Sequence, residues 1–223
     1  MSIIFYDCGF NRGTYRNLLI NQAKDKQGLL NMGIPNDLIG RDNSDIIYYA
    51  FEPNPDIIPF SKCPMEGVDI HNKAVWHTDG EILKFVVYGT SAMSSSLFNT
   101  DQSKNCINVE TIDFAKFLSE TCTKEDRVIV KLDIEGAEYE VLYKLISTGA
   151  VHLIDDLIIE FHKKGIVEFD QDKAKVVYNF FKQKEYANMN SLTAWKTVAL
   201  CWRVNAGRPG SPLSLPKHII YKK

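Results

Sequence analysis

Five short apolar runs, separated by stretches long enough for a helix, set the fold class of this chain. These runs are SIIFYD, IIYYAFE, VDIHNKAV, RVIVKLDIE and DDLIIEFH. Apolar runs that alternate with helical patterns are typical of a parallel sheet whose crossover connections carry helices. We therefore predict an α/β fold, with a mostly parallel sheet and helices on both of its faces.

The segment from 127 to 146 is the most informative of these. It begins as a nearly continuous β-branched run, as expected for a strand buried on both faces of a sheet. Asp133 and Glu135 interrupt the run, and after Gly136 apolar residues recur at helical spacing. The polar face of this helix is predicted to hold Glu138, Glu140 and Lys144. Open α/β sheets bind ligands at the carboxyl ends of their strands, so we predict a site around the two acids.

The length of 223 residues fits one domain, and we predict a single domain over residues 1–223. A polar stretch at about 24–45 is expected to be an insertion or lid loop, and a Pro- and Gly-rich loop is expected at about 205–217 between two strands. Residues 79–100 predict an antiparallel excursion followed by a polar loop near the site. Asp113 is predicted to cap a helix that runs to about Ser119.

Composition limits the classes of function. The chain is 45% hydrophobic, 11% aromatic and 24% charged, which is typical of a globular protein. Its net charge of -2 gives no general reason to expect nucleic acid as a partner. The five scattered cysteines favour neither a disulfide scaffold nor a zinc site. The sequence starts without a signal-peptide pattern and has no apolar run long enough for a membrane span, so we expect a soluble protein of the reducing cytoplasm.

A glycine-rich turn, DCGFNRG at 7–13, follows the first predicted strand. Such a turn lets the backbone approach a ligand closely and directs helix N–H groups at it. The dinucleotide fingerprint needs three spaced glycines, and only Gly9 and Gly13 are present here. The turn fits better the first loop of class I methyltransferases. Glu52 ends the second strand, where its two oxygens are suited to bind both hydroxyls of a ribose, although a capping or surface role is the alternative.

Eight segments, in order, resemble the FkbM family of S-adenosylmethionine-dependent methyltransferases. They are DCGFNRG at 7–13, YAFEPNP at 49–55, HNKAVW at 71–76, DGE at 79–81, SSSL at 94–97, VETIDF at 109–114, VKLDIEGAEYEVL at 130–142 and IIEFH at 158–162. The resemblance implies a Rossmann-like class I methyltransferase fold with a seven-stranded sheet. It also implies methyl transfer to a hydroxyl of a sugar, glycan or other small metabolite. The implied cofactor contacts are Asp7, Gly9, Asn11, Gly13, Glu52, Asn72, Ala74 and Asp133.

Methyl transfer to an alcohol needs a group that removes the hydroxyl proton. Two adjacent strand ends bring the candidate residues to one edge of the sheet, namely Asp133, Glu135, Glu160 and His162. Crowded carboxylates raise one another's pKa. Glu135 is equally explained by the helix dipole, and His162 by an edge position. A divalent ion held by Asp133 and Glu160 is an alternative, but we predict no metal ligands. Lys131, inside the apolar strand, is expected to pair with one of the acids.

Two other functions compete with a small-molecule or glycan O-methyltransferase. An RNA ribose methyltransferase also acts on a hydroxyl, but the chain lacks the basic, aromatic-interleaved patch that RNA binding favours. A catalytically silent domain that binds the cofactor or a partner is the other alternative, and the complete set of acids argues against it. The acceptor and the oligomeric state are not specified by the sequence.

Overall fold

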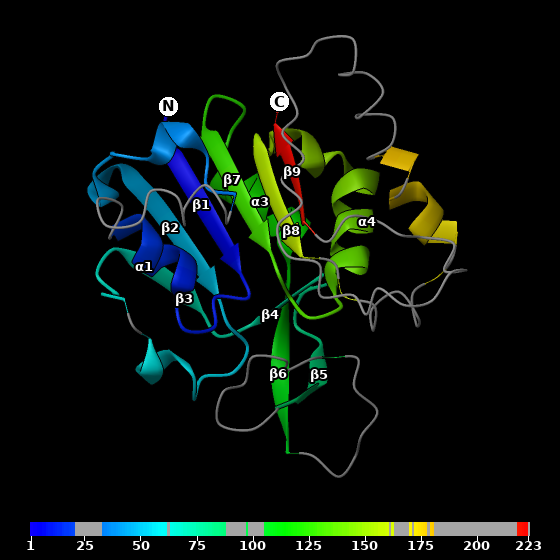
Figure 1. Ribbon diagram of the computed structural model, residues 1–223. Coiled ribbons are helices and arrows are strands. Elements are labelled where there is room, and N and C mark those ends of the chain that lie inside the picture. The colour runs from blue at the N-terminus through cyan, green and yellow to red at the C-terminus, as the bar shows by residue number, and fades with distance from the viewer. Residues whose placement is uncertain are drawn as a thin grey trace, which may run out of the picture.

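The computed structural model describes residues 1–20, 33–61, 63–87, 97, 105–160, 162, 170, 172–177, 179–180 and 218–222. Within these residues the chain forms one large sheet in the strand order β3-β2-β1-β7-β8-β9 and a smaller sheet in the order β4-β6-β5 (Figure 1). The predicted alternation of buried strands and helices along the chain is therefore confirmed.

The large sheet is mostly parallel. Its strands are β1 (Ile3–Cys8), β2 (Ile46–Phe51), β3 (Val68–His71), β7 (Arg127–Leu132), β8 (Asp156–Glu160) and β9 (His218–Lys222). Five of them run parallel to their neighbours, and β9 pairs antiparallel with β8. The described residues thus give this sheet six strands, rather than the seven that the family resemblance implies.

Helices cover both faces of the large sheet, as alternation along its strands requires. On one face, Tyr6, Val130 and Ile159 pack against α3 (Phe114–Thr121) and α4 (Glu138–Thr148). The opposite face packs on α1 (Thr14–Ile20) and on the segment that carries Ile34 and Leu38. Residues 172–177 and 179–180 are helical and extend the first cluster (Figure 1). A central strand buried on both sides explains the nearly continuous apolar run of β7.

The smaller sheet comes from the middle of the chain. It is built from β4 (Ala74–Trp76), β5 (Ile82–Val86) and β6 (Cys106–Asp113). β5 and β6 are antiparallel, which confirms the predicted antiparallel excursion. The run VDIHNKAV was predicted as one strand, and that is wrong: it divides at Asn72 and Lys73, so that β3 joins the large sheet and β4 the small one. Turn-favouring Asn72 accounts for the break.

Local signals near the helix ends also agree with the structure. The side chain of Asp113 accepts a hydrogen bond from the backbone N of Lys116 at 3.1 Å, which confirms the predicted cap of α3. Short 3₁₀ turns complete the described elements: η1 (Asn36–Leu38), η2 (Asn43–Asp45), η3 (Ile58–Phe60) and η4 (Ala150–Leu153).

Several predicted features lie outside the described residues. These are residues 24–32 of the 24–45 insertion, the serine-rich part of the loop after β5, the first of the two tail strands and the loop at about 205–217. The second tail strand is confirmed as β9. The four cysteines in the described part of the chain are free. None of the described helices has the length and apolar character needed to cross a bilayer.

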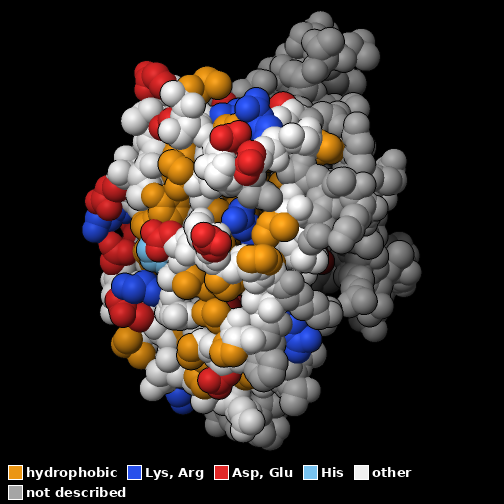
Figure 2. Space-filling model, turned by 90° about the vertical axis from the view of Figure 1, so that its left-hand side faces the viewer, with side chains coloured by type: hydrophobic (Ala, Val, Ile, Leu, Met, Phe, Trp, Pro, Cys, Tyr) orange, Lys and Arg blue, Asp and Glu red, His pale blue; other side chains and the backbone are white. Residues whose placement is uncertain are grey.

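Figure 2 shows the side of the molecule that carries the β3 edge of the large sheet. Lys and Arg side chains alternate there with Asp and Glu side chains, and hydrophobic side chains lie between them. A surface of this kind does not present the one-sign basic patch that is typical of nucleic-acid binding.

Candidate functional site

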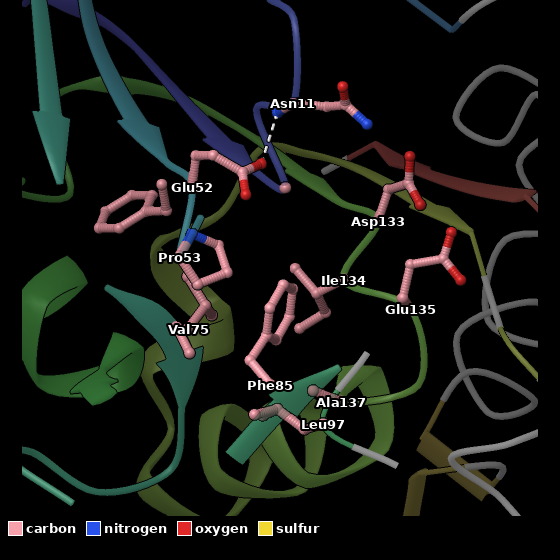
Figure 3. A pocket seen from close by; sticks show the side chains of 13 residues that line it. Asn11, Glu52, Pro53, Val75, Phe85, Leu97, Asp133, Ile134, Glu135 and Ala137 are labelled. Carbon is pink, nitrogen blue, oxygen red and sulfur yellow. Dashed lines mark hydrogen bonds between the residues drawn. The ribbon is translucent and has the colours of Figure 1, made fainter. Parts of the chain in front are cut away.

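A pocket opens where the carboxyl ends of β1, β2 and β7 meet the small sheet (Figure 3). It is lined by Gly9, Asn11, Phe51, Glu52, Pro53, Ala74, Val75, Phe85, Leu97, Asp133, Ile134, Glu135 and Ala137. This is the edge at which open α/β sheets place their ligands, because loops after parallel strands converge there. The predicted position of the site is therefore where the structure has its pocket.

The glycine turn after β1 packs directly against the loop after β7. Gly9 has a φ of +82°, and a Cβ at this residue would lie only 1.9 Å from the backbone oxygen of Asp133. Asn11 also has a positive φ, 51°, and its backbone N points towards Glu52. Gly13, with a φ of +71°, leaves no room for a Cβ beside the Sγ of Cys63. Glycine at 9 and 13 is thus required by close backbone approach.

Glu52 lies at the end of β2, with only 5% of its surface exposed. Its Oε2 accepts a hydrogen bond from the backbone N of Asn11 at 2.8 Å, and its Oε1 accepts one from the backbone N of Asn54 at 3.0 Å (Figure 3). Burial raises the pKa of Glu52 to about 7, although these hydrogen bonds oppose the rise. Each oxygen keeps a second lone pair, so the carboxylate retains capacity for two further donors.

Lys131 holds the ends of β1 and β7 together. Its Nζ donates to the backbone oxygen of Gly9 at 2.6 Å and lies 3.3 Å from Asp7 and 3.4 Å from Asp133. Burial alone would lower the pKa of Lys131, but the charges of Asp133 and Asp7 outweigh it and raise the pKa. The predicted pairing of Lys131 with an acid is confirmed, and the ammonium remains charged.

His162 follows β8 and lies among four carboxylates. Its Nε2 is 3.6 Å from Glu135, 3.9 Å from Asp133 and 3.9 Å from Glu160, and its Nδ1 is 2.8 Å from Glu138. Burial alone would lower the pKa of His162, but the hydrogen bond and charge of Glu138 outweigh it and raise the pKa to about 9. Burial and the charge of Asp133 raise the pKa of Glu160. The four residues predicted to serve the chemistry are thus brought together.

Glu138 was predicted to lie on the polar face of the helix, but its side chain is fully buried. It accepts hydrogen bonds from the backbone N of Ile134 at 3.0 Å and from that of Gly136 at 3.0 Å, as well as contacting His162. The helix begins after Ala137, which offers no side-chain cap. An acid in the first turn instead satisfies the amides of the loop before the helix.

Part of the pocket lining is apolar. Phe85 and Leu97 come from the excursion between β4 and β6, while Val75 and Ala137 close the floor (Figure 3). None of these four was predicted as a site residue. The sequence alone does not place them at the pocket, because their position depends on where the small sheet meets the large one.

The predicted cofactor contacts divide into two groups. Gly9, Asn11, Glu52, Ala74 and Asp133 line the pocket. Asp7, Gly13 and Asn72 do not belong to its lining. Asp7 is buried beneath the glycine turn, where its Oδ2 accepts a hydrogen bond from the hydroxyl of Tyr48 at 2.6 Å. Asn72 is exposed and donates to the backbone oxygen of Glu52 at 3.3 Å. These residues support the pocket from outside.

Comparison with protein families identifies the family of this chain. A family model described as the Methyltransferase FkbM domain matches residues 7–187, which is most of the chain. The chain belongs to the FkbM methyltransferase family. No curated protein and no solved structure matches it.

The FkbM match places the pocket entirely within the family domain. It covers the glycine turn, Glu52, the loop after β7 and His162, which are the parts that meet at the carboxyl edge of the sheet. The mostly parallel α/β sheet also agrees with an FkbM methyltransferase. Within the described residues, Asp133, Glu135 and His162 form one group whose ligand atoms lie within 4.8 Å of one another.

Proposed function

We propose that this FkbM-family protein transfers a methyl group from S-adenosylmethionine to a hydroxyl oxygen of a sugar, a glycan or another small metabolite. The observation that carries the proposal is a single pocket that joins two unlike ends. Glu52 and the glycine turn form one end, and the carboxylates beside His162 form the other. A cofactor and an acceptor would meet between them.

The residues of the first end fit S-adenosylmethionine. Glu52 has one lone pair free on each oxygen, which suits the two adjacent hydroxyls of a ribose. The glycine turn at Gly9 and Asn11 lets backbone groups approach the methionine part. Phe85, Val75 and Leu97 offer an apolar surface for a flat base. When bound, the cofactor supplies a methyl group already activated by its sulfonium.

The chain's own residues then have two tasks. They must hold an acceptor oxygen in line with the methyl group, which lowers the barrier through proximity. They must also take the proton of the hydroxyl. Glu160 suits the second task because burial and the charge of Asp133 raise its pKa. Asp133, which lines the pocket beside Gly9, would orient the hydroxyl.

The chemistry of the cluster favours an alcohol as acceptor. A hydroxyl needs a proton acceptor before it attacks. Asp133 and Glu135 line the pocket, and Glu160 lies within 3.9 Å of the same His162 ring. Polar acceptors with several hydroxyls, such as sugars, would also find hydrogen-bond partners in Asp133 and Glu135, whose carboxylates point to the same side in Figure 3. The mixed-sign surface of Figure 2 gives no support to RNA as acceptor.

The test uses the purified protein, radiolabelled S-adenosylmethionine and panels of monosaccharides, glycans and small alcohols, with an RNA oligonucleotide as comparison. With an acceptor identified, Asp133→Asn should reduce transfer by about 100-fold, as misplacement of a reacting group does. Cofactor affinity, measured by calorimetry, should change little. Asp69→Asn removes an exposed acid at the β3 edge and is the matched control.

Three results would change the proposal. Undiminished transfer by Asp133→Asn would remove this residue from the mechanism. Tight cofactor binding without transfer to any acceptor in the panels would favour a domain that binds the cofactor without catalysis. Transfer to RNA alone would assign the acceptor to nucleic acid.

A further inference from the structure

The loop after β7 and the end of β8 bring three different ligand-bearing side chains together. Asp133, Glu135 and His162 each direct one oxygen or nitrogen atom into a space where these atoms lie within 4.8 Å of one another. The Nε2 of His162 is 3.6 Å from an oxygen of Glu135 and 3.9 Å from an oxygen of Asp133. Two ligands of one tetrahedral ion, each about 2.1 Å from it, are about 3.4 Å apart. The observed distances need only small side-chain movements to reach that value.

The ring of His162 is fixed in the orientation that a metal ligand needs. Glu138 is fully buried and contacts Nδ1 at 2.8 Å, so that Nε2 is directed at Asp133 and Glu135. The backbone amides of Ile134 and Gly136 hold the Glu138 carboxylate in turn. A carboxylate that orients the outer nitrogen of a histidine is the usual second layer around a protein-bound metal.

The carboxylates around His162 also favour a bound metal ion. Four carboxylates, those of Asp133, Glu135, Glu138 and Glu160, lie within 3.9 Å of the His162 ring. Lys131 adds a second positive charge, 3.4 Å from Asp133. Carboxylates gathered around one imidazole offer oxygen ligands of opposite charge to a divalent cation.

We propose that Asp133, Glu135 and His162 form a binding site for a divalent transition-metal cation such as Mn²⁺. The mixed ligand set selects the class of ion: carboxylates suit Mg²⁺, Ca²⁺ and Mn²⁺, whereas an imidazole ligand favours a transition metal. Glu160 stays outside the ligand set, at the edge of the site. With three protein ligands, the ion keeps open positions for water or a hydroxyl.

The role of this ion rests on the proposed function, whereas its binding does not. A hydroxyl oxygen of the acceptor would occupy an open position of the ion, which would fix its place in the pocket and make its proton easier to remove. Asp133 and Glu135 line the pocket, so an ion held by them borders the space where cofactor and acceptor meet.

The test is a titration of the full chain with MnCl₂ alone, with free Mn²⁺ followed by electron paramagnetic resonance. We expect saturable binding of about one ion per chain. Glu135→Gln and His162→Gln should each weaken binding at least tenfold, since loss of even a supporting contact typically costs about 10–100-fold. Asp69→Asn, which removes an acid paired with His71 far along the sheet edge, should bind like the unmodified protein.

Circular dichroism and binding of S-adenosylhomocysteine serve as checks that each variant is folded. Because the Glu135 side chain is partly exposed, at 21%, its replacement by Gln should leave the fold intact even where His162→Gln does not. Absence of saturable Mn²⁺ binding, or binding by Glu135→Gln equal to that of the unmodified protein, would overturn the site. Cofactor binding without Mn²⁺ binding refutes only the metal site. Mn²⁺ binding without cofactor binding refutes the proposed function and leaves the metal site standing.

Discussion

Glu52 provides a direct test of the proposed cofactor site, because its protonation state should determine how well it binds the ribose hydroxyls. Folding raises its pKa from the ordinary 4.5 to about 7 by burial. Ribose hydroxyls that donate to this group favour the ionised carboxylate, so binding should be strongest above pH 7. Below that pH, binding must first displace a proton, and affinity should fall by up to about tenfold per pH unit.

The perturbation is Glu52→Gln, which keeps the size of the side chain and removes the charge. Hydrogen bonds to a charged group contribute about 1.5–3 kcal/mol, so this variant should bind S-adenosylhomocysteine at least about tenfold more weakly at pH 8. At pH 6 the unmodified Glu52 is mostly protonated, if its pKa is about 7, and resembles the amide. The difference between the two proteins should therefore shrink as the pH falls.

Stability should depend on pH in the opposite sense. A raised carboxyl pKa means that the folded protein holds this proton more tightly than the unfolded chain. The contribution of Glu52 to the free energy of unfolding is therefore greatest below pH 4.5 and is lost as the pH rises through about 7. The full loss is about 3 kcal/mol from the two pKa values. In Glu52→Gln this part of the pH dependence should disappear.

The assay is calorimetric titration with S-adenosylhomocysteine at pH 6, 7 and 8, together with urea unfolding at pH 5 and 8. Glu110→Gln removes an exposed acid that pairs with Lys73, and it should leave both the affinity and its pH dependence unchanged. An affinity of the unmodified protein that is flat between pH 6 and 8, or a slope that persists in Glu52→Gln, would refute this reasoning.

Two further predictions concern the backbone around the site. Gly9→Ala should lower the free energy of unfolding by about 2–5 kcal/mol, because it adds left-handed strain to a Cβ overlap with the Asp133 backbone. Gly80→Ala, with a φ of +73° and no atom within 4 Å of a Cβ, should lose only about 1–2 kcal/mol in the same urea unfolding. Glu138→Gln should lower stability by about 1–3 kcal/mol and speed hydrogen exchange of the loop amides before α4, whereas Glu140→Gln should not. Equal losses within either pair would contradict the contacts assigned here.

The large sheet could be predicted because burial on both faces leaves a simple mark in the sequence. Nearly continuous apolar runs predicted β1, β7 and β8, and the change to helical spacing after Gly136 predicted α4. The run that contains β3 and β4 misled the prediction, because its apolar residues continue across a break at Asn72. Which sheet a strand joins depends on distant partners, and no local pattern records those.

The site was predicted more completely on its polar side than on its apolar side. Acids at strand ends stand out in an apolar sequence, and the structure brings Asp133, Glu160 and His162 together. Glu138 was missed because helical spacing assigns it to the polar face, although a polar face need not face water. The useful signal was Ala137, a poor cap that leaves nearby amides to be satisfied by another acceptor.

Lys131 shows why the two ends of the pocket act as one site. Its ammonium touches the backbone oxygen of Gly9, on the side of the glycine turn, and the carboxylate of Asp133, on the side of His162. Burying the charged ammonium of Lys131 without these partners would cost free energy. Its contacts to Gly9 and Asp133 therefore stabilise each other. The closeness of Gly9 to Asp133 follows from this arrangement and leaves no room for a larger residue. A cofactor seated on the glycine turn would therefore lie against a loop whose acid is held by the same cation.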